Sequence, residues 1–151
     1  MTIEVRLADA AFDPAAEQAR FAASHPEAGA IAGFVGQVRA DGGVEELELS
    51  HYAPLTLPGM ERLGADAMAR FECLALMLVH RVGAMPPGEP IVMVLAAATH
   101  RRSALEAVDF CMDHLKSAAW FWKRERRGQA WQWIEPRAED HADLARWQGD
   151  I

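Results

Sequence analysis

The 151-residue sequence predicts an α+β fold with a mostly antiparallel sheet. Apolar and polar residues alternate in short segments near the N-terminus, which is typical of strands. Two continuous apolar runs in the middle of the chain have the length of buried strands, and segments with helical periodicity lie around them. The strands come in neighbouring pairs rather than in regular alternation with helices, which favours α+β over a parallel α/β sheet. We therefore expect a single domain, residues 1–151.

The first third of the chain predicts strand, helix, strand, turn and strand. Ile3 to Leu7 alternates like a strand, and Asp13-Pro14 supplies an N-cap and an N1 proline for a helix of about three turns. Ala28 to Arg39, rich in Gly and small apolar residues, predicts a strand. The turn residues Asp41-Gly42-Gly43 are expected to fold the chain back into a further strand, Val44 to Tyr52.

The middle of the chain predicts a helix and two central strands. Pro54 and Pro58-Gly59 are expected to break the chain, so that the helix occupies only Met60 to Phe71. The apolar runs Leu74 to Val82 and Ile91 to Ala98 predict strands buried on both faces, with a Pro-Pro-Gly turn between them.

The last third predicts a long helix, a short strand and a terminal helix. Ser103 to Ser117 has the clearest helical period, with one stripe expected to be buried: Leu105, Val108, Met112 and Leu115. Trp131 to Ile134 predicts a strand, and Ala138 to Trp147 predicts the terminal helix.

Charge is distributed unevenly along the chain. The net charge of −7 argues against binding to nucleic acid, which requires an excess of Lys and Arg. Residues 100–127 nevertheless contain seven Lys/Arg against four Asp/Glu, a net charge of +3. A small basic segment within an acidic protein indicates a local anion site rather than a surface for a polyanion.

Several other classes of protein are disfavoured. Cys73 and Cys111 are far apart and are expected to be reduced, packed thiols. Neither the cysteines nor the six histidines have metal-ligand spacing, so no metal and no cofactor are expected. The N-terminus lacks the pattern of a signal peptide, and the longest apolar run is too short to span a membrane, which predicts a cytoplasmic protein that does not bind membranes.

The two lysines are the most informative candidates for chemistry. Lys116 and Lys123 lie seven residues apart in the basic segment, in a chain that otherwise uses thirteen arginines for positive charge. Unlike arginine, lysine releases a proton readily when it is desolvated, and aromatic residues surround Lys123 in Trp120-Phe121-Trp122-Lys123. An aromatic wall would also suit a planar heterocycle. Two alternatives remain open: solvated surface lysines, and tryptophans that simply belong to the core.

Two further segments carry possible ligands for an anion. His100-Arg101-Arg102 follows a predicted strand and opens the long helix, where backbone N–H groups and arginines favour a phosphate. In Phe34 to Arg39, a Gly inside a strand precedes an Arg, which permits a close backbone approach. His80-Arg81 closes another strand, and we interpret it as a structural or sheet-edge pair.

Taken together, these segments resemble the molybdopterin synthase catalytic (large) subunit family over residues 28–135. The matching segments, in chain order, are Gly29-Ala30 with Phe34-x-Gly-x-Val-Arg39, Leu49-x-His-Tyr52, His80-Arg81-Val82-Gly83, Pro87-Gly88-Glu89, His100-Arg101, Met112-Asp113-x-Leu115-Lys116, Phe121-Trp122-Lys123-Arg124-Glu125 and Trp133-Ile134-Glu135. The chain departs from the family's pattern at Ser50, where the family usually has Glu, and in Ala53 to Pro58, which is longer than the usual connection.

The resemblance implies an α/β hammerhead-type fold with an additional small subdomain, and a homodimer within a heterotetramer. The other subunit would be a small ubiquitin-like sulfur carrier whose C-terminal Gly-Gly ends in a thiocarboxylate. The implied reaction is sulfur transfer to cyclic pyranopterin monophosphate, which yields molybdopterin for molybdenum cofactor biosynthesis. A non-catalytic module that binds a phosphate ligand or carrier protein, and a lysine Schiff-base enzyme, remain as alternatives.

The family's roles transfer to matching positions only. Lys116 and Lys123 match the catalytic lysines, and His100 and Arg101 match a pair that reaches the pocket from the partner subunit. The implied substrate-binding set is Phe34, Gln37, Val38, Arg39, His100, Arg101, Met112, Lys116, Lys123, Arg124 and Glu125.

Overall fold

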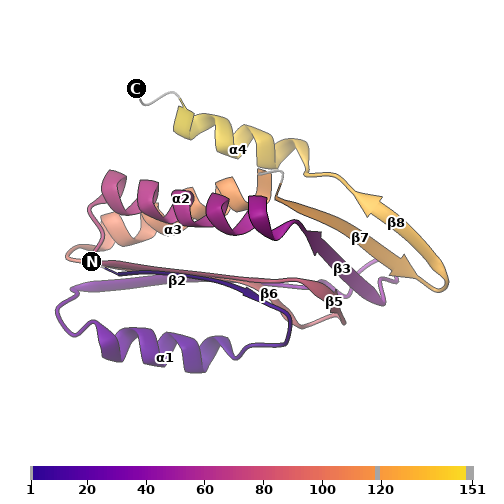
Figure 1. Ribbon diagram of the computed structural model, residues 1–151, viewed down its shortest axis with the longest axis horizontal. Coiled ribbons are helices and arrows are strands. Elements are labelled where there is room, and N and C mark those ends of the chain that lie inside the picture. Colours follow the sequence, from indigo (N-terminus) through magenta and orange to yellow (C-terminus); the bar gives the residue numbers. More distant parts are fainter. Residues whose placement is uncertain (1, 118–119, 149–151) are drawn as a thin grey trace.

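Two four-stranded sheets and four helices make up the computed structural model, which describes residues 2–117 and 120–148 (Figure 1). The first sheet has the strand order β1 (Thr2–Ala8), β4 (Ala75–Arg81), β6 (Pro90–Ala98) and β2 (Ala30–Gln37). Only β1 and β4 pair in parallel, and the other neighbours in this sheet are antiparallel. The predicted α+β fold with mostly antiparallel strands is therefore confirmed.

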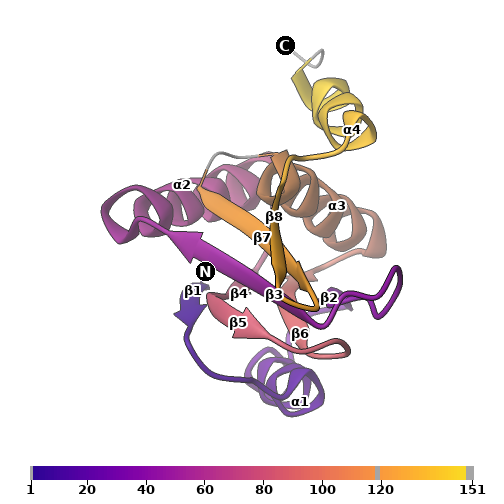
Figure 2. The same cartoon turned by 90° about the vertical axis from the view of Figure 1, so that its right-hand side faces the viewer.

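The second sheet is smaller and entirely antiparallel. Its order is β5 (Gly83–Met85), β3 (Glu46–His51), β7 (Phe121–Arg127) and β8 (Ala130–Ile134). Figure 2 shows these strands crossing in front of the first sheet. We identify this sheet with the additional subdomain that the sequence predicts, and it carries one of the two predicted lysines.

Helices cover both faces of the first sheet. The helix α1 (Pro14–Ser24) lies below it in Figure 1, and α2 (Ala53–Phe71) and α3 (Arg101–Ser117) lie above it. Leu76 and Leu78 of β4 pack in the cluster with α2 and α3, whereas the alternate residues Met77 and Val79 pack with Phe21 of α1. A strand buried on both faces must be apolar throughout, which explains the continuous apolar runs of β4 and β6.

The terminal helix α4 (Ala138–Gln148) contains no buried residue and is attached to α3 by polar contacts and by the Trp147 ring, which packs edge-on against Phe110. Arg146 pairs with Asp109 and Asp113 at 2.6 and 2.7 Å, and Trp147 Nε1 donates to the Asp113 carboxylate at 2.6 Å. Its first turn lies near the C-terminal end of α3, where Ser117 Oγ donates to the Asp140 carbonyl at 2.9 Å. The start of α4 is thereby held against the end of α3.

Most predicted elements are confirmed, including the N-cap at Asp13, whose carboxylate accepts hydrogen bonds from the N–H groups of Ala15 and Ala16. Cys73 and Cys111 are free and buried, as expected. One helix boundary is wrong, since α2 begins at Ala53 and includes Pro58. Pro54 occupies the first turn, where the missing N–H costs nothing.

The glycine after Pro58 has a packing role instead of a helix-breaking one. A Cβ at Gly59 would lie 2.4 Å from Cε2 of Trp120, so only glycine allows this indole to lie against α2. One turn earlier, the buried Thr56 hydroxyl donates to the Trp120 carbonyl at 2.8 Å. The start of α2 therefore fixes the residue that precedes β7.

Three further predictions need correction. The turn at residues 41–43 does not join a hairpin, because β2 pairs with β6 whereas β3 pairs with β5 and β7 in the other sheet. Leu105 is 54% exposed, and the buried face of α3 begins at Ala104 instead. The strands β5 and β7 had no counterpart in the prediction, since β5 is three residues long and β7 has almost no apolar alternation.

Within the described residues, no helix is both long and apolar enough to cross a membrane.

Candidate functional site

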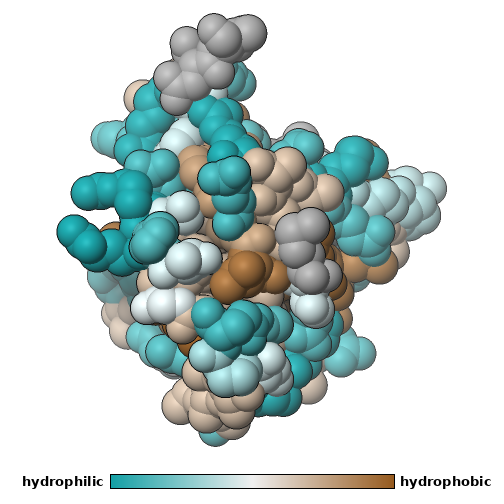
Figure 3. Space-filling model, turned by 90° about the vertical axis from the view of Figure 1, so that its left-hand side faces the viewer, coloured by the Kyte–Doolittle hydropathy of each residue, from teal (hydrophilic) through white to brown (hydrophobic). Residues whose placement is uncertain are grey.

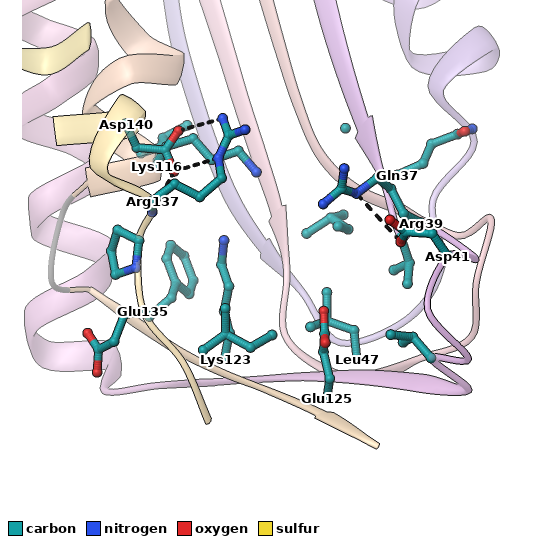
Figure 4. Close-up of a pocket in the computed structure, with 18 of the residues that line it drawn as sticks. Gln37, Arg39, Asp41, Leu47, Lys116, Lys123, Glu125, Glu135, Arg137 and Asp140 are labelled. Atoms are coloured by element: carbon teal, nitrogen blue, oxygen red, sulfur yellow. Dashed lines mark hydrogen bonds and ion pairs between the residues drawn. The ribbon is translucent and has the colours of Figure 1, made fainter. Parts of the chain in front are cut away.

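A cavity of about 580 Å³ lies between the C-terminal end of β2 and the inner face of β7 (Figure 4). Seven of the predicted site residues line it: Phe34, Gln37, Val38, Arg39, Lys116, Lys123 and Glu125. They come from segments that are far apart in the sequence, and the two sheets bring them together. The opposite walls of the cavity are here called the arginine wall (residues 37–39) and the lysine wall (residues 116, 121 and 123).

Alternation along β7 determines which of its side chains face the cavity. Phe121, Lys123 and Glu125 line the cavity, and the residues between them point to the outer face of the sheet. Lys123 pairs with Leu49 of β3 and with Ile134 of β8. Because Leu49 is buried and Ile134 packs against the same small core, the stem of Lys123 emerges from apolar surroundings.

The other lysine reaches the cavity from the last turn of α3. Lys116 lies next to the start of α4, where Arg137 and Asp140 also line the cavity (Figure 4). Arg137 pairs with the Asp140 carboxylate at 3.0 Å, and this hydrogen bond is the main cause that lowers the pKa of Asp140. Among residues 2–117 and 120–148, neither Lys116 nor Lys123 has an ion pair within 4.0 Å.

The pKa values of both lysines are lowered. Burial lowers the pKa of Lys123 to about 8, and the positive charge of Lys116 contributes to the same shift. Burial also lowers the pKa of Lys116, against an opposing effect of Asp140. An amine whose pKa lies near neutral pH exists in both protonation states under working conditions, as proton transfer requires.

The arginine wall is more open to solvent. The Arg39 side chain is 80% exposed, and its ion pair with Asp41 is long, at 3.8 Å. Such exposed pairs contribute little to stability, roughly 0–1 kcal/mol, so Arg39 can turn towards an anion at small cost. Val38 contributes mainly backbone, because its side chain is buried in the small core.

A neighbouring groove of about 330 Å³ contains the predicted residue Met112. It lies between β2 and α3 and shares Phe34, Lys116 and Arg137 with the main cavity. Met112 itself is buried, whereas Phe34, which lines the same groove, is 41% exposed. Met112 therefore lies beside the lysine wall without lining the main cavity.

The structure places Arg124 outside the cavity, which differs from the prediction. Its guanidinium donates to the Glu48 carboxylate at 2.8 and 3.1 Å on the outer face of β7. It also lies over the ring of Trp131, 4.1 Å from the centroid. Trp122 is on the same face and is 47% exposed. Of the predicted aromatic wall, only Phe121 reaches the cavity.

His100 and Arg101 are also remote from the cavity within one chain. Arg101 and Lys116 lie at opposite ends of the 17-residue α3, roughly 22 Å apart along its axis at 1.5 Å per residue. Both His100 and Arg101 are exposed. Figure 3 looks onto the end of the molecule where α3 begins, and hydrophilic residues cover much of that surface around a smaller hydrophobic area.

Arg137 and Asp140, the charged neighbours of Lys116, had no counterpart among the predicted site residues. Arg137 lies two residues after the Trp133-Ile134-Glu135 segment, between a strand and a helix, and this position was the available signal. In the part of the chain that the structure describes, no cluster of three or more His, Cys, Asp or Glu could hold a metal ion. The cavity thus offers cations, carboxylates and two tunable amines to a ligand.

These features define an α+β protein with a lysine-containing cavity between two sheets. The family of MoaE proteins matches residues 7–118. The chain is 44% identical over 144 residues to the molybdopterin synthase catalytic subunit of Caulobacter vibrioides, covering 95% of this chain and 96% of that protein. The corresponding subunit of Ralstonia nicotianae is 42% identical, over 95% of this chain and 83% of that protein.

Solved structures agree with this assignment. The MoaE protein of Burkholderia ambifaria superposes with a TM-score of 0.83 at 40% identity, covering 97% of this chain and 98% of that one. A complex of subunits 1 and 2 of molybdopterin-converting factor from Helicobacter pylori shares the fold, with a TM-score of 0.77 at 20% identity over 88% and 91% of the two chains. The chain belongs to the MoaE family, that of molybdopterin synthase catalytic subunits.

Proposed function

We propose that the chain is a sulfurtransferase that converts cyclic pyranopterin monophosphate to molybdopterin. The sulfur would come from the C-terminal thiocarboxylate of a small ubiquitin-like sulfur-carrier subunit ending in Gly-Gly. Family membership supports the reaction class. The observation that carries the proposal is the presence in one cavity of two half-buried lysines that have lowered pKa values and no ion pair to any residue that the structure describes.

The charges of the cavity suit the ligands of this reaction. A phosphorylated pterin and the C-terminal tail of a carrier are both anionic, and Arg39 and Arg137 lie where they could hold such groups. The cavity volume of about 580 Å³ falls within the range of roughly 300–1,000 Å³ that is typical of small-molecule sites.

The lysines suit the chemical steps. Opening the cyclic phosphate and replacing a pterin oxygen by sulfur require a group that gives and takes protons, and Lys123 has a pKa of about 8. Negative charge that develops during the transfer would be stabilised by Lys116 and Arg39 in a partly dry site. We assign Lys116 and Lys123 as the catalytic residues, and Phe34, Gln37, Val38 and Glu125 as further substrate contacts.

We further propose a homodimer within a heterotetramer, in which His100 and Arg101 enter the cavity of a second copy. Their exposure and their distance from the cavity of their own chain support this arrangement. The Helicobacter pylori complex joins two different subunits, which supports a small-subunit partner for the present chain as well. A single domain and a cytoplasmic location remain predictions.

The test is reconstitution from the purified chain, thiocarboxylated carrier and cyclic pyranopterin monophosphate, with detection of the dithiolene product. We expect Lys116→Ala to reduce product formation by about 10²–10⁴-fold, the usual contribution of a proton-transfer residue. Arg62→Ala is the control for loss of one positive charge, since Arg62 is exposed on α2 away from the cavity.

Each outcome of this assay has a definite meaning. Product from the wild-type protein and the Arg62→Ala protein, with none from Lys116→Ala, supports the proposal. Full turnover by a folded Lys116→Ala protein contradicts the role of that lysine. Binding of carrier and precursor without any product from the wild-type protein identifies a non-catalytic binding module instead.

A further inference from the structure

The C-terminal end of β4 holds two buried polar residues that the proposed chemistry does not use. His80 and Arg81 are each 4% exposed, and Thr56 is the only other buried polar side chain in the described residues. Burying an arginine carries a desolvation cost of several kcal/mol unless it is paired. Because neighbouring residues of a strand project to opposite faces, this dipeptide can contact two different segments.

His80 contacts the lysine wall. Its ring stacks on Phe121, with centroids 3.8 Å apart and planes inclined by 17°. Its Nδ1 lies 2.9 Å from the Arg81 carbonyl oxygen, which can only accept, so Nδ1 carries the proton and the ring orientation is fixed. Phe121 lines the cavity two residues before Lys123. The imidazole thus lies directly behind the lysine wall.

The imidazole is held neutral in this position. Burial lowers the pKa of His80 to about 3, and the positive charges of Lys123 and Lys116 lower it further, while the hydrogen bond to the Arg81 carbonyl acts in the opposite direction. A neutral ring excludes water from the lysine wall without adding a third cation to it. This property suits a side chain that supports two amines with lowered pKa values.

Arg81 acts on the arginine wall through two intermediates. Its Nη1 lies 2.7 Å from the Glu89 carboxylate, an ion pair in which both side chains are largely buried. The backbone of the same turn is hydrogen-bonded to Val38, whose N–H donates to the Glu89 carbonyl at 3.0 Å and whose carbonyl accepts from Gly88 N–H at 2.8 Å. Val38 immediately precedes Arg39, so the ion pair anchors the segment that presents this arginine.

We infer that His80 and Arg81 are positioning residues that fix the lysine wall and the arginine wall relative to each other from a single point on β4. His80 fixes the lysine wall through Phe121, and Arg81 fixes the arginine wall through Glu89 and Val38. The inference rests on the proposed function for its kinetic consequences, whereas its structural consequences are measurable without any turnover.

Variants of His80 and of Glu89 separate the effect of His80 on the lysine wall from the effect of Arg81 on the arginine wall. His80→Asn keeps a donor for the Arg81 carbonyl but removes the stack, and His80→Phe keeps a ring but removes the donor. For His80→Asn, we expect kcat to fall about tenfold with little change in KM, because the lysines are less well positioned and more exposed to water. For Glu89→Gln, which weakens the Arg81 pair, we expect KM for the precursor to rise several-fold while kcat changes less than twofold.

The pKa values of the lysines provide a readout that needs no activity. The chain has only two lysines, so a protein labelled with ¹³C at lysine Cε gives two signals whose titration reports both pKa values. In His80→Asn, water should reach Lys123 and raise its pKa by about one unit, whereas Glu89→Gln should leave it unchanged. His80→Phe should retain most of the shift because the ring is retained.

These measurements decide between positioning and mere stabilisation. A folded His80→Asn protein with wild-type kcat and wild-type lysine titration would overturn the inference. If His80→Asn does not fold, Phe121→Leu removes the same stack from the other side and should raise the pKa of Lys123 equally. An unchanged Lys123 titration in Phe121→Leu would also overturn the inference. If the wild-type protein forms no dithiolene, the proposed function fails, and the titrations alone then decide this inference.

Discussion

The two faces of β7 carry similar charges in opposite environments. On the inner face, Lys123 has no ion-pair partner within the described residues, and burial lowers its pKa to about 8. On the outer face, Arg124 and Arg126 pair with glutamates of β3, and these hydrogen bonds raise their pKa values. Residues one position apart are thus either stabilised as cations or held close to losing the proton.

Arg124 and Lys123 show the difference between a positive charge that stabilises the sheet and one that faces the cavity. Arg124 is bidentate to Glu48 and stacked on Trp131, an arrangement that suits a planar guanidinium that stays protonated. Lys123 emerges beside Phe121 towards an open cavity and forms no ion pair with the part of the chain that the structure describes. A positive residue in the sequence acquires a role only from the face of the strand on which it lies.

Exchanging the two kinds of cation gives the largest expected effect. Lys123→Arg keeps the positive charge but cannot release a proton near neutral pH, so dithiolene formation should fall by about 10²-fold or more. The reciprocal change Arg124→Lys, on the outer face, should alter the rate less than threefold. Equal losses in both variants, measured with folded protein, would mean that charge alone matters on either face.

Stability should respond to the two faces with opposite sign. The unfolded chain keeps the Lys123 proton up to its ordinary pKa of 10.5, whereas the folded chain releases it at about 8. The charged form therefore costs stability below pH 8, and wild-type stability should rise between pH 8 and 10.5. Lys123→Met should stabilise the protein at pH 7 by up to about 3 kcal/mol, at about 1.4 kcal/mol per pKa unit.

Urea unfolding at pH 7 and at pH 10 measures this difference. The gain from Lys123→Met should be smaller at the higher pH, because folded wild-type protein is then mostly neutral at this position. A gain that does not depend on pH would assign the effect to better apolar packing rather than to the buried charge.

The same assay should show a small loss of stability when a cation of the outer face is removed. Arg124→Met removes a partly exposed ion pair and a cation–π contact, so the loss of stability should be clearly smaller in size than the gain from Lys123→Met. Glu48→Gln is the partner variant, and a double-mutant cycle should give a coupling of the same size. Independent, additive effects of the two substitutions would show that this pair does not stabilise the sheet.

The sequence predicted best those elements whose pattern matches their burial. β4 and β6 are apolar throughout because helices cover both faces, and Asp13-Pro14 begins α1 by local hydrogen bonding alone. Predictions failed where tertiary contacts override local preference. Pro58 and Gly59 lie inside α2 because that helix packs against Trp120, a contact 61 residues away that no local pattern reveals.

The candidate site was predictable by residue type but not by geometry. Both lysines and Arg39 were identified from composition, spacing and resemblance, and they line one cavity. Arg124 was placed in the same set by resemblance, and no strand was predicted for β7 whose alternation could have separated Arg124 from Lys123. The position of Arg137 depends on the way α4 docks on α3, through polar contacts and the single ring of Trp147 rather than through an apolar stripe.

Direct titration of the two lysines in the wild-type protein tests most simply whether the cavity tunes them. With ¹³C-labelled lysine Cε, we expect two separate transitions, one near pH 8 for Lys123 and one below the ordinary value of 10.5 for Lys116, assigned by Lys123→Arg and Lys116→Arg. Two coincident transitions at about 10.5 would mean that both amines are ordinary surface lysines, and would contradict their assignment as the proton-transfer groups of the cavity.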